Sequence, residues 1–160
     1  MLPEVVKQMI GKKSTPRICE VTRLDIRKIA DAIGNRDPLY WDDDYAATTR
    51  YGSIIAPPDF FGWPLKWEPE QALPNSSELK SYLLKELPKA GYNRAISAGT
   101  ESEFYRAVRP GDTLVLVSEI ISLEEKVGKT SGKMLISTIE TTVTNQNGDL
   151  VARQRESIIQ

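Results

Sequence analysis

Residues 113–127 of this chain read TLVLVSEIISLEEKV, and residues 133–145 read KMLISTIETTVTN. In both segments apolar side chains alternate with polar ones, which is the period-two pattern of a β-strand with one buried face. Residues 94–108 and 150–159 carry the same kind of pattern. Because these segments exceed the usual strand length of about 5–6 residues, the back half of the chain predicts a long, strongly twisted antiparallel meander.

Short turn motifs separate these segments. Residues 110–112 are Pro-Gly-Asp, residues 128–132 begin and end with glycine, and residues 147–148 are Asn-Gly. Asn-Gly between alternating segments is the strongest short hairpin signal, because both residues tolerate the positive φ of a type I′ turn. Residues 128–132 followed by Lys133 look suited to phosphate, but Val127 stands where a P-loop needs glycine. We therefore interpret them as a hairpin turn.

The front half of the chain is helical and irregular. Residues 3–10 predict a short amphipathic helix, and residues 17–21 predict a short strand. Thr22 suits a helix N-cap, and the helix that it begins should end at Gly34. A further helix is predicted at residues 78–87.

The most apolar and aromatic stretch of the chain is residues 54–67, IIAPPDFFGWPLKW. Pro58 suits the first turn of a helix, whereas Gly62 and Pro64 would shorten or kink that helix. A long antiparallel sheet must cover one of its faces, and this segment is the natural element to be wrapped. The sequence therefore predicts an α+β fold in which a long curved antiparallel sheet wraps around a central helix.

The composition excludes several kinds of site. The chain has no histidine and one cysteine, Cys19, so Ser–His–Asp and Cys–His systems and ordinary zinc sites are ruled out. We expect Cys19 to be a small buried residue. The acidic run at residues 42–44 is better explained as a helix N-terminus than as a metal site, because adjacent carboxylates point in different directions. No metal is therefore expected.

The charge balance also excludes classes of partner. Lys and Arg number 21 against 22 Asp and Glu, a formal net charge of −1. Nucleic-acid binding would require a clear basic excess. The chain shows no signal-peptide pattern and no apolar run of about 18 residues, so we expect a cytoplasmic protein that does not enter a membrane.

Residues 34–49, GNRDPLYWDDDYAATT, resemble the signature of the MaoC-like hydratases and dehydratases. In that family the motif runs Asp-x-Asn-Pro-Leu-His, followed by acidic residues, an aromatic residue and Ala-Ala. Residues 54–58 fall where the family has its Ile-Val-His-Gly-like turn into the central helix. Residues 104–112 resemble its Phe-x-x-Pro-Val-x-x-Gly-Asp segment. The resemblance covers residues 16–160.

The Pro-Pro turn and the longer insert after Trp67 are similar to the N-terminal type of MaoC domain, the fatty-acid-synthase-like dehydratases. The resemblance implies a single hot-dog domain over residues 1–160, with an N-terminal helix within residues 1–15. It also implies acyl-CoA or acyl-carrier-protein thioesters as ligands, with no cofactor, in fatty-acid or steroid metabolism. The family hydrates trans-2-enoyl thioesters or dehydrates (3R)-hydroxyacyl thioesters.

Three positions depart from the chemistry of the family. Its catalytic Asp falls on Asn35 and its His on Tyr40, and the glycine whose N–H binds the oxyanion falls on Pro58. An amide cannot take a proton, a phenol with an ordinary pKa of about 10 is a poor base, and proline has no N–H. Pro57 has none either. The resemblance therefore implies no catalytic residue in this chain.

We interpret the chain as the non-catalytic subunit of a heteromeric enoyl-thioester hydratase or 3-hydroxyacyl-thioester dehydratase. Its partner would be a second MaoC-like hot-dog chain with an intact Asp and His, in a dimer or a dimer of dimers. The residues expected to bind substrate are Asn35, Asp37, Tyr40, Ala56, Pro57, Pro58 and Phe60.

Structural interpretations of several of these residues stay open. Asn35 can bridge a turn after a glycine instead of facing substrate. Tyr40 and Trp41 can be core aromatics, and Phe60 can belong to the wrapped helix. Arg106 and Arg109 can be solvated strand-edge charges or can reach the phosphate of a thioester carrier.

Two other functions also stay open. A hot-dog thioesterase would use a carboxylate to activate water or to attack the acyl carbon. Its candidates are Asp37, Asp59, Glu101 and Glu103, of which Asp59 is best placed, in the first turn of the expected central helix. A non-enzymatic acyl-thioester binding module would bind ligand without turnover.

Overall fold

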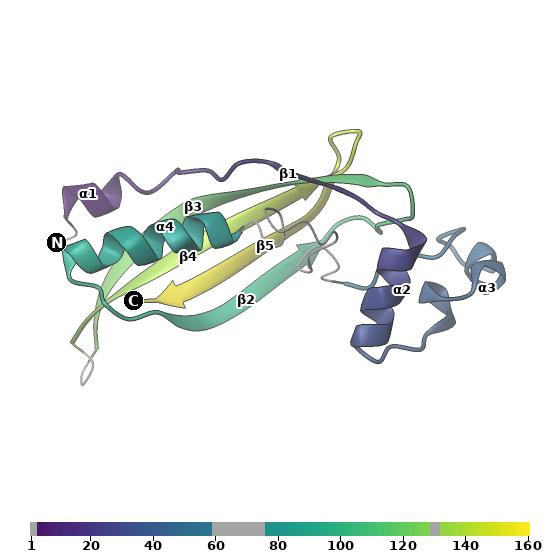
Figure 1. Cartoon of the computed structure of the whole chain (residues 1–160), viewed down its shortest axis with the longest axis horizontal. Helices are drawn as coiled ribbons and strands as arrows, with labels where there is room; N and C mark the ends of the chain where they lie inside the picture. Colours follow the sequence, from purple (N-terminus) through teal and green to yellow (C-terminus); the bar gives the residue numbers. More distant parts are fainter. Residues whose placement is uncertain (1–2, 59–75, 129–131) are drawn as a thin grey trace.

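The computed structural model of the chain describes residues 3–58, 76–128 and 132–160 (Figure 1). Its elements follow the order expected from the sequence, with helices concentrated before the long strands. They are α1 Glu4–Lys7, β1 Arg17–Glu20, α2 Arg23–Ala32, the 3-10 helix η1 Pro38–Tyr40, α3 Asp43–Thr48, α4 Ser76–Glu86, the 3-10 helix η3 Leu87–Ala90, β2 Ile96–Phe104, β3 Thr113–Gly128, β4 Gly132–Thr144 and β5 Leu150–Ile159.

The strands form one five-stranded antiparallel sheet in the order β1-β3-β4-β5-β2. Strands β3, β4 and β5 make the predicted meander, with Ser118 opposite Thr141 and Thr141 opposite Gln154. Strand β2 departs from it, because it pairs with β5 and not with β3. After β2, the N–H groups of Tyr105 and Arg106 donate to the Val151 carbonyl at 2.9 and 3.2 Å. The chain therefore stays beside β5 before it crosses to β3.

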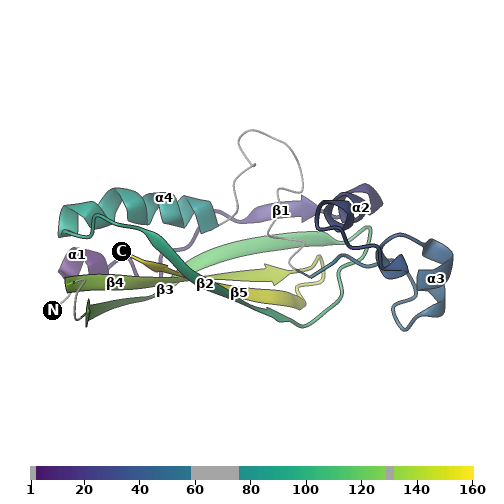
Figure 2. The same cartoon turned by 90° about the horizontal axis from the view of Figure 1, so that it is seen from below.

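Helix α4 covers one face of the sheet, whereas no described helix covers the opposite face (Figure 2). The apolar side of α4 packs on inward-facing residues of the long strands, since alternate positions of β3 and β4 are buried. This first cluster includes Leu79, Leu83, Leu87, Ile120, Leu123, Leu135, Ile139 and Ile158. It forms the core at one end of the molecule.

A second hydrophobic cluster lies at the other end of the sheet, under α2. It joins Ile26 and Ile29 of α2 to Leu114 of β3 and Val143 of β4. In the register of the sheet, Ser118 and Thr141 lie between the two clusters, and their hydroxyls are 2.6 Å apart. The sheet therefore supports two separate cores, and α2 and α3 extend beyond its end (Figure 1).

The predicted central helix after Pro58 lies outside the described residues. Within the described part of the chain, the helix on the sheet is α4, which the sequence predicts as a further helix at residues 78–87. Of the three leucines of α4, Leu79 and Leu83 are buried and Leu84 is exposed, and Leu87 at the start of η3 is buried as well.

The caps of α2 and α3 follow the sequence prediction. Thr22 caps α2 in a capping box with Asp25, in which each side chain accepts the other residue's backbone N–H at 3.2 Å. Asp42 caps α3 by accepting the Tyr45 N–H at 3.0 Å, and Asp43 pairs with Arg23. Across the described residues no group of three carboxylate, histidine or cysteine side chains could hold a metal.

Two further observations concern the single cysteine and the hydropathy of the helices. Cys19 is buried, as expected from its type. None of the helices in the part of the chain that the structure describes is long and apolar enough to cross a membrane.

Replacing Leu83 tests the attachment of α4 to the sheet. Leu83 is 0% exposed in the first cluster, so Leu83→Ala should lower the free energy of unfolding by about 2–5 kcal/mol through lost burial and a cavity. Leu84, on the same helix, is 54% exposed, so Leu84→Ala should change it by less than about 0.5 kcal/mol. Urea unfolding measures both variants, and equal losses would contradict this packing.

Candidate functional site

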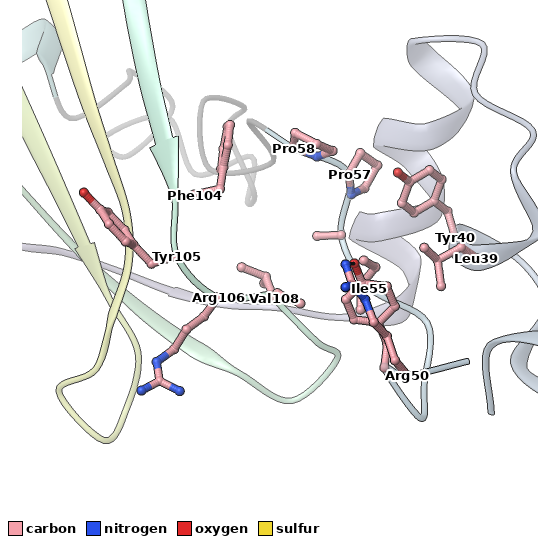
Figure 3. A pocket seen from close by; sticks show the side chains of 13 residues that line it. Leu39, Tyr40, Arg50, Ile55, Pro57, Pro58, Phe104, Tyr105, Arg106 and Val108 are labelled. Atoms are coloured by element: carbon pink, nitrogen blue, oxygen red, sulfur yellow. Dashed lines mark hydrogen bonds between the residues drawn. The ribbon is translucent and has the colours of Figure 1, made fainter. Parts of the chain in front are cut away.

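A cavity of about 390 Å³ lies between η1 and the segment that follows β2 (Figure 3). Its described lining comes from residues 39–40, residues 50–51 and 55–58, and residues 104–108. Small-molecule sites usually measure about 300–1,000 Å³ and are mostly apolar with a few polar groups. The size and the lining of this cavity therefore fit a small-molecule or acyl-chain site.

Backbone hydrogen bonds hold residues 55–58 across the cavity. The Ala56 N–H donates to the Val108 carbonyl at 2.8 Å, and the Ile55 N–H donates to the Leu39 carbonyl at 3.4 Å. These bonds join the segment to η1 on one side and to the chain after β2 on the other. We call residues 55–58 the strap.

The structure brings four of the expected binding residues together. Tyr40 from η1 and Ala56, Pro57 and Pro58 from the strap all line the cavity. Figure 3 shows the Tyr40 hydroxyl directed toward Pro57. Phe60, another of the seven expected residues, lies outside the described residues.

Asn35 and Asp37 are not among the lining residues; they organise the turn that carries Tyr40. The Asn35 side-chain oxygen accepts the Asp37 N–H at 3.0 Å, and the Asn35 backbone carbonyl accepts the Trp41 Nε1–H at 2.8 Å. The Asp37 carboxylate caps η1 by accepting the Leu39 N–H at 2.9 Å. In this structure both residues have the turn-forming contacts that Asn and Asp often make.

Arg50 and Tyr51 line the cavity, although sequence reasoning did not single them out. An Arg50 Nη2–H donates to the Tyr51 hydroxyl at 2.7 Å, and the guanidinium lies 4.8 Å from the centre of the Tyr51 ring. Phe104 and Tyr105 also line it, from the end of β2. No local motif marks these residues, since only the tertiary fold brings residues 50–51 and residues 104–105 to the same cavity.

The two arginines considered for phosphate binding are both held by protein groups. Arg106 lines the cavity, but its guanidinium pairs with Asp149 at 3.1 Å and points away from the strap (Figure 3). Arg109 donates from Nη2 to the Tyr51 carbonyl at 3.3 Å. These contacts agree with the strand-edge interpretation of both side chains.

The strap provides no unused backbone donor to the cavity. The N–H groups of Ile55 and Ala56 are occupied by carbonyls, and Pro57 and Pro58 have no N–H. Stabilising a developing oxyanion requires donors aimed at that oxygen. These four residues therefore cannot form a backbone oxyanion hole.

The described lining of the cavity has no side chain that takes up protons at neutral pH. Among the lining residues that the structure describes there is no Asp, Glu, Lys or Cys, and the chain has no His. General acid–base catalysis needs such a group within hydrogen-bond reach of the reacting atoms. The described part of the cavity can bind a ligand but has no base.

Tyr40 is the lining residue best suited to hold a ligand oxygen. Burial raises the pKa of its hydroxyl, and the negative charge of Asp37 and the neighbouring Tyr51 raise it further. The phenol therefore stays protonated throughout the neutral range. It can donate a hydrogen bond, but it cannot act as a base there.

The described carboxylates considered for thioester hydrolysis lie elsewhere. Asp37 caps η1, and Glu101 and Glu103 of β2 pair with Arg155 at 3.8 and 3.1 Å. The Tyr105 hydroxyl donates to Glu103, and this bond, together with Arg155 and Arg153, lowers the pKa of Glu103. Asp59 lies outside the described residues.

Comparison with known proteins places the chain among dehydratase domains. A family model described as "FAS1-like, dehydratase domain region" matches residues 8–154. A probable enoyl-CoA hydratase alpha subunit from Thermomonospora curvata is 29% identical over 138 residues, which are 81% of this chain. The chain spans only 41% of the length of that relative.

Solved structures of high similarity include two complexes from Mycobacterium tuberculosis. A chain of the ChsH1-ChsH2 complex gives a TM-score of 0.80 at 23% identity, covering 98% of this chain and 93% of that chain. A chain of the C-terminally truncated HadBC complex, a 3R-hydroxyacyl-ACP dehydratase, gives 0.65 at 20% identity, covering 95% and 97%. At these identities the likeness shows the fold, which is the predicted α+β hot dog.

The raised pKa of Tyr40 can be measured directly. The absorbance of the wild-type chain near 295 nm, minus that of Tyr40→Phe, should show a titration whose midpoint lies above the ordinary value of about 10. Because the folded pKa is raised, the linked stability is complete below pH 10 and is lost as the pH rises through the folded pKa. A midpoint below 10 would contradict the burial of this hydroxyl.

Proposed function

The chain belongs to the family of FAS1-like dehydratase domains, and we propose that it acts as the non-catalytic subunit of a two-chain enoyl-thioester hydratase or 3-hydroxyacyl-thioester dehydratase. The proposal covers residues 1–160 as one hot-dog domain. It places the protein in the cytoplasm, where it would act on fatty-acyl or steroid-derived thioesters of CoA or of an acyl carrier protein.

The observation that carries this proposal is a cavity of about 390 Å³ whose described lining contains no base. Hydration of a trans-2-enoyl thioester needs a group that activates water for attack at C3, a proton at C2 and donors on the thioester oxygen. The described lining has no carboxylate and no histidine, and the strap has no unused N–H. The described part of the cavity therefore supports a binding role without the chemical step.

The lining suits the acyl part of a thioester. Leu39, Ile55, Pro57, Phe104 and Val108 give apolar surface that an acyl chain would bury. The protonated Tyr40 hydroxyl supplies one donor for an acyl oxygen. In this proposal the subunit holds and orients part of the substrate while its partner carries out proton transfer.

Two observations support a partner chain. The HadBC and ChsH1-ChsH2 neighbours are complexes named for two chains, and a curated relative is described as an alpha subunit. In addition, β2 is an edge of the sheet, and residues 96–101 of it are all exposed. Such an edge can pair with a strand of another chain. We propose a second MaoC-like hot-dog chain with an intact Asp and His, in a dimer or a dimer of dimers.

Two alternative functions differ from this proposal in testable ways. A thioesterase would need a carboxylate at the cavity, and none of the described carboxylates is part of its lining. Hydrolysis of acyl-CoA by the pure chain, abolished by Asp59→Asn, would establish it. A binding module would bind thioesters but remain without turnover alongside every dyad-bearing chain.

Reconstitution tests the proposed role. The chain alone should hydrate enoyl-CoA at a negligible rate, since loss of one positioned acid–base group typically costs about 10²- to 10⁴-fold. Co-expression with a MaoC-type chain that carries Asp-x-Asn-Pro-x-His should yield a co-purifying complex with high turnover. The matched control is the same complex with that partner's His replaced by Ala, which should be inactive. Full turnover by the lone chain would overturn the proposal.

Filling the cavity tests its use in binding. Ala107 lines the cavity, so Ala107→Trp should weaken binding of long-chain enoyl-CoA to the reconstituted complex by roughly 10-fold or more, as overpacking costs about 1–3 kcal/mol. Ala47→Trp, at an exposed position of α3 outside the lining, is the matched control. Isothermal titration calorimetry measures both, and equal affinities would show that the acyl group binds elsewhere.

A further inference from the structure

Strand β2 is a long edge strand that carries two glutamates and no basic residue. It runs over Ile96–Phe104, pairs with β5 on one side, and has no described strand on its other side. The opposite edge of the sheet, β1, is only four residues long. A long edge strand can offer N–H and C=O groups for pairing with another chain. The side chains next to those groups therefore influence which chain can pair.

Glu101 and Glu103 point to the face of the sheet opposite α4. Glu156 of β5 pairs with Lys80 of α4 at 2.6 Å, so Glu156 faces the helix. Arg155 precedes it and points the other way, because side chains alternate along a strand. Glu101 lies opposite Arg155 in the register of β2 and β5, and it shares the face of Arg155.

On this face, next to the edge, negatively charged side chains outnumber positively charged ones. Arg155 contacts Glu140 at 2.8 Å, Glu103 at 3.1 Å and Glu101 at 3.8 Å, and Arg153 contacts Glu140 at 3.4 Å. Three carboxylates thus meet two guanidinium groups, which leaves one net negative charge. The side chain of Glu101, on the outermost strand, is 72% exposed. The excess negative charge therefore lies at the edge.

A second copy of this chain would meet these glutamates with its own. When two identical antiparallel strands pair about a two-fold axis, residues equally far before and after the axis lie opposite each other. With residue 101, 102 or 103 on the axis, a glutamate of one copy directly faces a glutamate of the other. With residue 100 on the axis, the two copies of Glu101 are diagonal neighbours. The register shift between Ser97 and Gly99 interrupts the ladder before residue 100, so regular pairing favours these registers.

Like charges opposite each other across a strand pair are destabilising, and opposite charges are stabilising. We propose that the acidic edge of β2 disfavours self-pairing and selects a different chain, whose edge strand places Lys or Arg opposite Glu101 and Glu103. This inference rests on the proposed function, because the partner that it describes is the catalytic hot-dog chain. It adds the charge by which that partner is recognised.

A charge-swapped version of the chain can represent such a partner. The probe is the double variant Glu101→Lys/Glu103→Lys, mixed in equal amounts with the wild-type chain. Sedimentation equilibrium should show a mixed dimer that forms roughly 3- to 10-fold more tightly than either homodimer, and added salt should reduce the difference. Hydrogen exchange should show protection of the β2 amides in the mixed dimer.

A neutral variant and a distant control make the test independent of folding defects. Glu101→Gln/Glu103→Gln should self-associate roughly 3- to 10-fold more tightly than the wild type, because the repulsion is gone. Glu124→Lys changes an exposed glutamate of β3, away from the edge, and should leave self-association unchanged. If the lysine variant does not fold, the self-association of the glutamine variant tests the proposal by itself.

Three results would overturn the inference. The first is that the glutamine variant self-associates no more tightly than the wild type. The second is that the mixture forms no mixed dimer. The third is that the mixed dimer protects amides outside β2 from hydrogen exchange and leaves those of β2 unprotected. None of them bears on the reconstituted hydratase assay, so a failure of charge selection and a failure of the proposed function are distinguishable. Inactive reconstitution with intact charge selection would overturn only the proposed function.

Discussion

The pairing of β3 with β4 is the constraint on which the rest of the structure depends. Their ladder runs from Val115 opposite Thr144 to Gly128 opposite Gly132. A slip of one residue would turn every buried side chain of a strand to the opposite face. The register therefore fixes both hydrophobic clusters at once, one under α4 and the other under α2.

The segments that leave the end of this sheet position the cavity. The chain leaves β2 beside β5 and places residues 104–108 opposite η1, and the strap is hydrogen-bonded to both sides. Those same bonds use the N–H groups of Ile55 and Ala56, and proline removes the next two. The architecture that shapes the cavity is thus also the reason why the backbone of its strap cannot stabilise an oxyanion.

Binding and catalysis are separable in this fold because they depend on different features. Binding requires an apolar space of the right size, which the packing of backbone segments provides. Catalysis requires a few proton-transferring groups and donors at particular atoms. The described lining keeps the space and the phenolic donor of Tyr40, and it has no base. This combination is what a supporting subunit needs if its partner supplies the chemistry.

The sequence by itself determined the features that depend on neighbouring residues. Period-two alternation located β3, β4 and β5, side-chain capping located the starts of α2 and α3, and composition excluded histidine chemistry. Only the tertiary structure decided that β2 pairs with β5, that the turn at Asn35 and Asp37 satisfies its own polar groups, and that Arg50 and Tyr51 line the cavity. Local periodicity says which face of a strand is buried. It cannot say which strand lies beside it or which distant segments meet, because those contacts join residues far apart in the chain. The turn at Asn35 and Asp37 is local, and there the sequence left two roles open, turn formation and substrate contact, between which the observed hydrogen bonds favour the turn.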